Sequence, residues 1–549
     1  MSGRSTSDHL DLGRKASHVC TPCRKQKKAC DKLFPSCSTC SRLRRECSYE
    51  SGPAPDLGSL ESLSARLINL EDEMSEHRAM CEGRIAISAI KPASHHPLPQ
   101  GDAFDHSSAL SSAFFLDVNV FRLKNTKVPK RQFGIEDKIL DDLGDKLELQ
   151  TIVGAYFFSV APWMSIIQRN RFYEETLAGQ VELTADIVFL ILCMKLLNDT
   201  VPPGETPRTE LWYHAKNRFL SLVSSGYASI RLLQAGVLFC LYETGHSIYP
   251  EAYISIGHLA RLGQAIGLHD TAGIPQMALE PTTWDEMEER RRVWWALWIL
   301  DRHMNVGNPS RALAMAETGR REYLPVDDVS FERGVQTISE PLFVSSSTDI
   351  TAAPLARLCQ ASHLLSLVLK HVNDRDSNAD DRLEEAKQLS RAILALCSFM
   401  DSEIGADATR IFVPKATCLS ALLTLYEHSS ALKPGSFALT AELELNELGI
   451  SGLNSLVPHI ALYTTHIQTI VPYNLGQASP LICHCLYRMA VWISSLSTEN
   501  MRPDYSKLLH STRETLAKLN MRWQVAGAYL KMLNYIESAP FSSEPIIQD

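Results

Sequence analysis

Six cysteines lie within the 28 residues from Cys20 to Cys47, in a chain of 549 residues that has 14 cysteines in all. Their spacing is C-x2-C-x6-C-x6-C-x2-C-x6-C, which is two C-x2-C-x6-C halves joined by six residues. A C-x2-C turn presents two thiolates to one metal ion, as zinc sites commonly do. Each half supplies three sulfur ligands whereas tetrahedral zinc takes four, so two zinc ions can share six cysteines only if two thiolates bridge. The spacing predicts a binuclear zinc cluster with the ligands Cys20, Cys23, Cys30, Cys37, Cys40 and Cys47.

Three other chemistries could use clustered cysteines. The N-terminal residues are polar without an apolar signal segment, and the longest apolar run, IVFLILCM, is far shorter than the roughly 18 residues that suggest a membrane span. We therefore expect an intracellular protein with no membrane partner, in which a disulfide framework fits badly. A single zinc ribbon would use four cysteines and leave two over, and an iron–sulfur cluster would not explain the neighbouring lysines.

Basic charge is concentrated around the same cysteines. Residues 14–45 contain ten lysines or arginines and one acidic residue, Asp31, which gives them a net charge of +9. The whole chain has a formal net charge of -9, so the remainder has -18. A compact basic segment on an acidic body predicts a polyanionic partner for that segment alone.

The cysteine spacing, the basic run CRKQKKAC and Pro35, two residues before Cys37, resemble the fungal Zn2Cys6 (binuclear zinc cluster) transcription factors. The resemblance implies two zinc ions per cluster, with Cys20 and Cys37 as the bridging ligands. It also implies binding to double-stranded DNA in the nucleus, and it identifies residues 18–50 as the DNA-binding domain.

The run from Arg24 to Lys28 is expected to form a short helix that metal binding stabilises and that enters the major groove. Lysine can donate there to O6 and N7 of guanine. The resemblance implies recognition of a CGG triplet, and Lys27 best matches the base-contacting lysine. Gln26 stands where many members have a basic residue, which leaves the preferred triplet open. The expected phosphate contacts are Arg24, Lys25, Lys28, Lys32, Arg42, Arg44 and Arg45; the alternative is that some of them solvate the cluster or serve nuclear import.

Residues 1–17 are expected to be disordered, and residues 51–59 are rich in Pro, Gly and Ser and form a predicted linker. Residues 60–78 then have apolar side chains at spacings of 3, 4, 3 and 4, which favours a short parallel dimeric coiled coil. The alternative is an amphipathic helix that packs on the same chain. The predicted dimerisation residues are Leu60, Leu63, Leu67, Leu70 and Met74. Residues 79–133 have no sustained period and are expected to be an irregular linker.

Helical periodicity prevails over residues 134–535, which predicts one large all-α domain, followed by a flexible tail at 536–549 that could also be a short activation segment. The segment AYFFSVAPWMSIIQRNRFYEE and the segment EERRRVWWALWILDRHMNVGNPSRAL resemble the middle homology domain of fungal transcription factors. Trp294, Leu297 and Trp298 fall on one helical face and are expected to be core residues, and Asp301 with Arg302 is expected to form a local polar network.

The sequence does not contain G-x-S-x-G, H-E-x-x-H, G-x-G-x-x-G or P-loop motifs, so we do not expect an enzyme. Cys483-His484-Cys485 lies in an apolar run that favours a packed helix over a metal site. The leading hypothesis is a nuclear, sequence-specific regulator of RNA polymerase II transcription that binds CGG-like half-sites as a homodimer and contacts co-regulators. A pathway-specific regulator of a fungal secondary-metabolite gene cluster, with a helical domain that could sense a small molecule, suits this layout. The alternatives are a metabolite-binding or enzymatic protein with a structural zinc module, and a zinc-dependent assembly protein.

Overall fold

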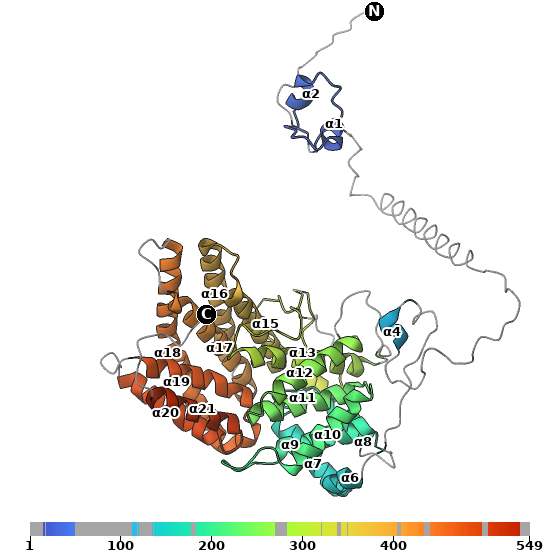
Figure 1. Ribbon diagram of the computed structural model, residues 1–549, viewed down its shortest axis with the longest axis vertical. Helices are drawn as coiled ribbons and strands as arrows, with labels where there is room; N and C mark the ends of the chain where they lie inside the picture. Colours follow the sequence, from blue (N-terminus) through green and yellow to red (C-terminus); the bar gives the residue numbers. More distant parts are fainter. Residues whose placement is uncertain are drawn as a thin grey trace, which may run out of the picture. The chain divides into compact units, whose positions relative to one another are not determined.

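The protein is described by a computed structural model, which divides into two compact units, Met1–Gln100 and Gly101–Asp549 (Figure 1). The described residues are 15–16, 18–33, 35–49, 112–117, 119, 134, 137–176, 183–268, 281, 283–319, 321–336, 342–347, 350–402, 408–432, 440–496 and 503–538. The predicted linker at 51–59 and the predicted coiled coil at 60–78, with all five of its seam residues, lie outside them. So do nearly all of the predicted N-terminal tail and most of the segment 79–133.

The described residues of the first unit form two helices of equal length, α1 (Thr21–Lys25) and α2 (Ser38–Arg42). An isolated β-bridge pairs Lys15 with Leu33. Elsewhere in the described residues the second isolated bridge pairs Tyr323 with Phe343, and no strand is formed.

The second unit is helical, as the periodicity predicted. Its helices up to residue 333 are α4 (Ser112–Leu116), α6 (Asp137–Leu143), α7 (Lys146–Ser159), α8 (Arg169–Thr176), α9 (Ala185–Asn198), α10 (Glu210–Ser224), α11 (Ile230–Gly245), α12 (Glu251–Ala265), α13 (Trp284–Asn305) and α14 (Asp328–Arg333). The rest are α15 (Pro354–Asn373), α16 (Ala379–Ser402), η1 (Ala408–Ile411), α17 (Phe412–Ala431), α18 (Thr440–Asn474), η2 (Leu475–Gln477), η3 (Pro480–Ile482), α19 (Cys483–Ser495), α20 (Pro503–Leu519) and α21 (Gln524–Ser538). No described helix is both long and apolar enough to span a membrane.

The structure differs from the sequence-based expectation in two segments outside the predicted helical domain. The segment 79–133 was expected to be irregular, yet it contains the helix α4. The C-terminal tail was expected from residue 536, but α21 continues to Ser538 because Leu533 packs into the core and holds the last turns of the helix.

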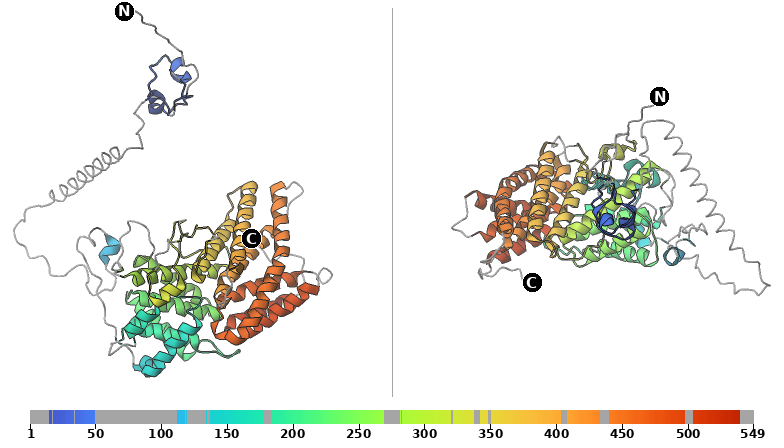
Figure 2. Two further views of the ribbon diagram at one scale, coloured as in Figure 1. Left: turned by 180° about the vertical axis from the view of Figure 1, so that it is seen from behind. Right: turned by 90° about the horizontal axis from the view of Figure 1, so that it is seen from above.

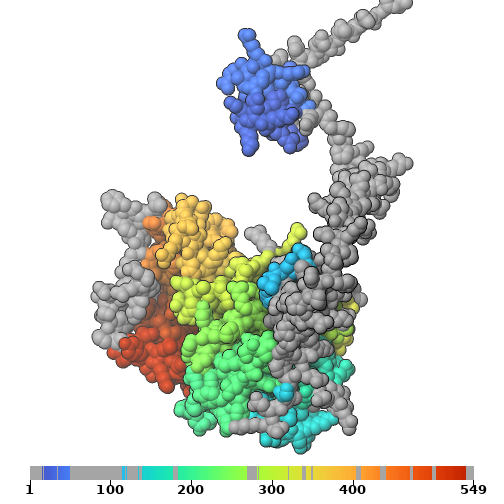
Figure 3. Space-filling model, turned by 45° about the vertical axis from the view of Figure 1, so that its right-hand side comes forward, coloured from blue at the N-terminus to red at the C-terminus, as the bar shows by residue number. Residues whose placement is uncertain are grey.

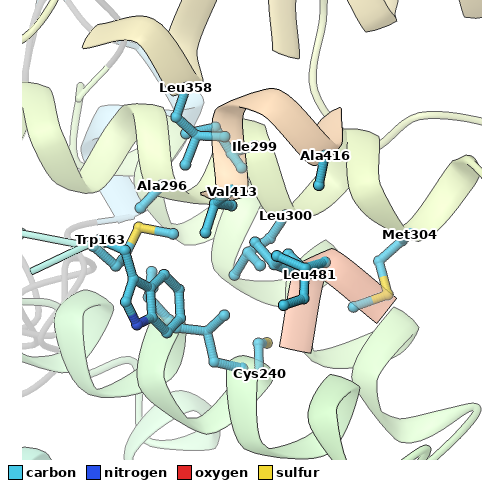
Figure 4. Close-up of a cluster of buried hydrophobic side chains, with 14 of the residues drawn as sticks. Trp163, Cys240, Ala296, Ile299, Leu300, Met304, Leu358, Val413, Ala416 and Leu481 are labelled. Atoms are coloured by element: carbon cyan, nitrogen blue, oxygen red, sulfur yellow. The ribbon is translucent and has the colours of Figure 1, made fainter. Parts of the chain in front are cut away.

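One hydrophobic core runs through the helical unit. Helices α6–α10 lie at one side of this unit and α18–α21 at the other (Figures 1 and 2). Helix α9 is apolar almost all round and nearly every residue is buried, as expected for a helix with neighbours on all sides. Figure 4 shows side chains from several helices meeting in the core, among them Cys240 of α11, Ile299 and Leu300 of α13, Leu358 of α15, Val413 and Ala416 of α17, and Leu481 of η3.

Trp294 and Trp298 of α13 are buried, as predicted: Trp294 is 8% exposed and Trp298 is fully buried. The indole N–H of Trp295 donates to the carbonyl oxygen of Tyr323 at 2.9 Å, and that of Trp298 donates to Ala316 O at 3.1 Å. Two tryptophan side chains of α13 therefore fill the core and also hydrogen-bond to the backbone of the segment that follows the helix.

Asp301 and Arg302 form the predicted local network. The carboxylate of Asp301 accepts from the backbone N–H groups of Ala314 and Met315, at 3.0 and 3.1 Å. Arg302 donates to the same carboxylate at 2.9 Å. Both side chains are buried, and each neutralises the charge of the other.

Arg292 is the most fully satisfied buried charge of α13. Its guanidinium donates to Glu288 Oε1 at 2.9 Å, to Asp328 Oδ1 at 2.7 Å and to Val326 O at 2.8 Å. It also stacks over the ring of Phe331, 3.9 Å from the centroid. These contacts join α13 to α14 through charges that water does not reach.

Replacing Arg292 by alanine is expected to lower the free energy of unfolding of the helical unit by about 3–5 kcal/mol, because Asp328 would keep a buried charge without its cation and Glu288 would retain Arg291 alone. Arg391→Ala is the control: Arg391 is exposed, its 3.2 Å ion pair with Glu384 is solvated, and its loss is expected to cost less than about 1 kcal/mol. Denaturant unfolding followed by circular dichroism gives both values. Equal, small losses would contradict the role given to Arg292.

Candidate metal centre and nucleic-acid interface

The six cysteines of the first unit converge on one place. The sulfur atoms of Cys20, Cys23, Cys30 and Cys37 all lie within 4.8 Å of one another, and so do those of Cys20, Cys37, Cys40 and Cys47. The two sets of four share Cys20 and Cys37. All six are free thiols, so the cluster is not a disulfide framework.

The separations between sulfur atoms suit tetrahedral zinc. Cys20 Sγ lies 3.6 Å from Cys37 Sγ and 3.7 Å from both Cys40 Sγ and Cys30 Sγ. A regular tetrahedron with Zn–S bonds of about 2.3 Å places its sulfurs roughly 3.8 Å apart. The donor set and its spacing therefore fit two zinc ions, each held by four sulfurs.

The two halves of the sequence repeat fold in the same way. Cys20 is the N-cap of α1 and Cys37 is the N-cap of α2. In each half the second cysteine, Cys23 or Cys40, follows one turn later, and residues three apart lie on the same side of a helix. Each C-x2-C pair consequently directs its sulfurs to one side.

Each helix ends in the same reversal of the chain. Lys27 has a φ of 49° and Arg44 a φ of 48°, which is the left-handed conformation. The N–H of Lys28 donates to Cys23 O, and the N–H of Arg45 donates to Cys40 O, both at 3.0 Å. This is the hydrogen-bond pattern that ends many helices. It turns the chain back so that the third cysteine of each half reaches the sulfur cluster.

The expected helix over the basic run is therefore wrong in extent. Helix α1 contains Arg24 and Lys25 but ends at Lys25, and Gln26 is its C-cap. Helix propensity favoured continuation through Lys28, but the return of the chain to Cys30 requires the reversal at Lys27. Lys27 lies at this corner rather than on a helical face.

Burial disfavours the thiolate form of three cysteines of the cluster, whereas hydrogen bonds lower the pKa of Cys30 to about 7 and that of Cys47 as well. Cys20 and Cys37 are fully buried, and Cys23 and Cys40 are 3% and 2% exposed. Desolvation raises the pKa of Cys20, Cys23 and Cys40 to about 12 each. Thiolates at these positions therefore need a cation in contact with them, which zinc supplies when bound.

The basic side chains surround the sulfur cluster on its outside. The described residues between 15 and 49 form a compact group of atoms (Figure 3). Lys32 is half-buried, and the other basic residues predicted to contact DNA are exposed: Arg24, Lys25, Lys27, Lys28, Arg42, Arg44 and Arg45. Gln26 is also exposed. A polyanion can thus be contacted without access to the metal ligands.

Sequence reasoning missed several side-chain links between the halves. The carboxylate of Asp31 accepts from the backbone N–H of Ser38 at 3.0 Å, and this and other hydrogen bonds from Ser38 lower the pKa of Asp31. Thr39 Oγ1 donates to Ala29 O at 2.8 Å. Asp31 had a visible signal, because it is the one acidic residue among the basic residues of 14–45.

The motif Cys483-His484-Cys485 is packed in α19, as predicted, and all three residues are buried. His484 Nδ1 lies 3.4 Å from Ser420 Oγ, and burial lowers the pKa of His484. Within the described residues, groups of three or more potential metal ligands occur in the N-terminal cysteine cluster and nowhere else.

Comparison with known proteins agrees with this geometry. The family model described as "Fungal Zn(2)-Cys(6) binuclear cluster domain" matches residues 18–53, and "Fungal specific transcription factor domain" matches residues 153–400. "Transcription factor BOA15" of Botryotinia fuckeliana is 33% identical over 180 residues, which is 33% of this chain and 98% of that protein.

Two further relatives extend over more of the chain. "Azaphilone cluster-specific transcription factor azaR" of Aspergillus niger is 24% identical over 381 residues, 66% of this chain and 73% of the relative. "Citrinin biosynthesis transcriptional activator mrl3" of Monascus ruber is 24% identical over 346 residues, 58% of this chain and 65% of the relative.

A cysteine cluster suited to two metal ions, a basic surface around it and a helical body define a zinc-dependent, DNA-binding regulator. The chain belongs to the fungal Zn2Cys6 transcription factors, and it is related to cluster-specific regulators of secondary metabolism. Members of this family are transcription factors rather than enzymes, and they bind DNA and two zinc ions. Membership of the family implies a nuclear location.

Zinc content is expected to depend on which cysteine is removed. Cys20 belongs to both sets of four sulfurs and Cys30 to one, so Cys20→Ser should lose more zinc than Cys30→Ser. Cys485→Ser, in α19, should keep two ions per chain. Elemental analysis of the purified full-length variants measures this, and two retained zinc ions in Cys20→Ser would contradict the sharing of Cys20.

Proposed function

We propose that this chain is a sequence-specific regulator of RNA polymerase II transcription that controls one secondary-metabolite gene cluster. It binds CGG-like DNA half-sites as a homodimer in the nucleus. The observation that carries the proposal is the exposed basic surface built around two sets of four sulfurs that share two members. The printed names of the azaphilone and citrinin relatives support the assignment to a metabolite gene cluster.

The six cysteines of the cluster act as the zinc ligands, with Cys20 and Cys37 bridging. Their membership of both sets of four sulfurs supports this role. Bound zinc supplies a structural cross-link between the halves. The protein's own contribution is the pair of chain reversals that place Lys27 and Arg44 at equivalent corners.

Lys27 contacts the base edges. It is exposed, and it lies at the corner that a hydrogen bond from Lys28 N to Cys23 O holds rigid. A lysine side chain that extends from this corner can donate to O6 and N7 of guanine in the major groove. The other basic residues contact phosphates, which contributes affinity and salt dependence rather than sequence preference. They are Arg24, Lys25, Lys28, Lys32, Arg42, Arg44 and Arg45.

The segment 60–78 pairs two subunits through Leu60, Leu63, Leu67, Leu70 and Met74. The heptad spacing of these residues supports the pairing, and two subunits would place two DNA-binding units on paired half-sites. The helical body contacts the transcription machinery or co-regulators.

The body also offers a place for a small-molecule effector. A hollow of about 390 Å³ opens beside the end of α9, in the size range of ligand pockets. Its lining includes Asp199, Val201, Glu205, Leu211 and Tyr242. A metabolite-binding protein with a structural zinc module would also use such a hollow, and DNA selection separates the two functions.

Lys27→Ala is expected to weaken binding to the preferred site by about 1–3 kcal/mol and to flatten the preference for guanine, because a base contact is lost. Selection of random duplex DNA by the full-length, zinc-loaded protein measures both effects. Lys25→Ala is the matched control, since loss of a phosphate contact weakens binding to all sequences alike. Uniform weakening by Lys27→Ala would show that Lys27 contacts phosphate only.

Leu63→Asp combined with Leu67→Asp is expected to convert the dimer to a monomer, because two charges would lie in the apolar seam. Arg66→Ala, at a position expected to face solvent, should leave the dimer intact. Sedimentation velocity of the full-length proteins gives the masses, and a dimer that survives the double substitution would place dimerisation elsewhere.

A further inference from the structure

The hollow beside the end of α9 has an acidic lining. Its lining residues include Asp199 and Glu205 but no lysine, arginine or histidine. Asp199 is the C-cap of α9, and Glu205 lies in the loop between α9 and α10. Neither side chain forms a hydrogen bond or a close ion pair with another described residue. The chain therefore places two negative charges at the hollow without a positive charge among its lining residues.

The basic residues that flank the lining segments have partners elsewhere. Arg208 Nη2 donates to Glu251 Oε1 at 2.7 Å. The ammonium group of Lys195 donates to the carbonyl oxygen of Asp142. Burial raises the pKa of Asp199, and the charge of Lys195 opposes only part of that rise. The charge of Asp199 is therefore only partly compensated by the chain itself.

The position of Asp199 at a helix end increases the attraction for a cation. The C-terminal end of a helix carries a partial negative charge, so a cation is stabilising there and a carboxylate is not. Asp199 has the same sign of charge as the end of α9 that it caps. The other helix end at the hollow is the start of α10, where Thr209 Oγ1 accepts from the N–H of Trp212 at 3.2 Å. A cation bound beside Asp199 would offset the repulsion at the end of α9.

The remainder of the hollow suits an apolar group. Leu196, Val201 and Leu211 line it together with Tyr242. The hydroxyl of Tyr242 donates to Pro207 O at 2.7 Å, which holds the tyrosine side chain in place. A volume of about 390 Å³ lies at the small end of the range of ligand pockets. Size and chemistry together describe a small cation that has an apolar part.

The loop that carries Glu205 is held by the last helix of the chain. Gln524 Nε2, on the first residue of α21, donates to Glu205 O at 2.9 Å and to Pro202 O at 3.3 Å. The wall of the hollow is thus fixed before a ligand binds, which reduces the entropy that binding would cost. The same two hydrogen bonds connect the hollow to α21.

We propose that the hollow beside the end of α9 binds a small organic cation, a protonated amine with a short apolar part, whose charge Asp199 and Glu205 neutralise. A primary amine such as the lysine side chain has a pKa of about 10, so it is cationic at neutral pH. This inference gives the chemical class of the small-molecule effector and rests on the proposed function for its role in regulation. Binding of the amine is measured without DNA.

The probe is phenethylamine, titrated into the full-length, zinc-loaded protein by isothermal calorimetry. Two molecules of similar size provide the comparison: phenylpropanoate is an anion, and phenethyl alcohol is neutral. The amine is expected to bind at least about tenfold more tightly than either of them, because only the amine forms charge-assisted hydrogen bonds with a carboxylate.

Asp199→Asn keeps the size of the side chain and removes its charge, so it should weaken binding of phenethylamine by about tenfold. Asp380→Asn is the matched control, because Asp380 is exposed in the first turn of α16 and does not line the hollow. The affinity of this control should equal that of the wild type. Circular dichroism of both variants establishes that their helical units are folded.

The inference is overturned if phenethylamine does not bind, if phenylpropanoate binds as tightly as the amine, or if Asp199→Asn binds the amine as the wild type does. Selection of random duplex DNA tests the proposed function separately. A wild-type protein that enriches no motif would overturn the proposed function, whether or not the amine binds.

Discussion

The DNA-binding unit depends on the sharing of two sulfur atoms between two sets of four. Six cysteines cannot give two metal ions four separate ligands each, so two sulfurs have to be shared, and Cys20 and Cys37 are the two members common to both sets of four. Both are helix N-caps and both are fully buried, which places the start of each short helix at the centre of the unit. Helices of five residues are far too short to be stable alone, so their geometry is set from this centre.

The same constraint accounts for the basic corners. A third cysteine that must return to the cluster forces the chain to reverse after each helix, and Lys27 and Arg44 adopt left-handed conformations to do so. The reversal places charged side chains on the outside while the sulfurs stay inside. Metal binding and presentation of cations are thus two consequences of one path of the chain.

The helical unit buries charged residues as well as apolar ones. Arg292 pairs with both Glu288 and Asp328, and Arg291 supplies a second positive charge at Glu288. Trp295 and Trp298 on the same helix contribute apolar area and one indole hydrogen bond each. Helix α13 therefore organises both the core and the irregular segment after it, which fits a body that serves as a stable platform for regulation.

The sequence predicted the features that depend on residue type and spacing. The convergence of the six cysteines, the helical class of the body and the burial of Trp298 all followed from local pattern. The end of α1 at Lys25 did not follow from local pattern. Helix propensity favours continuation through Lys28, but the chain has to reverse at Lys27 so that Cys30 returns to the sulfur cluster. The hydrogen bond from Arg45 Nη1 to Gln26 Oε1 was equally invisible, because it joins residues 19 positions apart through the fold of both halves.

X-ray absorption at the zinc edge of the full-length protein tests the sharing of sulfurs most directly. Two tetrahedra that share the Cys20–Cys37 edge, 3.6 Å long, place their zinc ions about 3 Å apart with four sulfurs around each. The account predicts this short zinc–zinc scattering path. Isolated zinc ions, with nitrogen or oxygen completing each coordination sphere and no zinc neighbour, would contradict it.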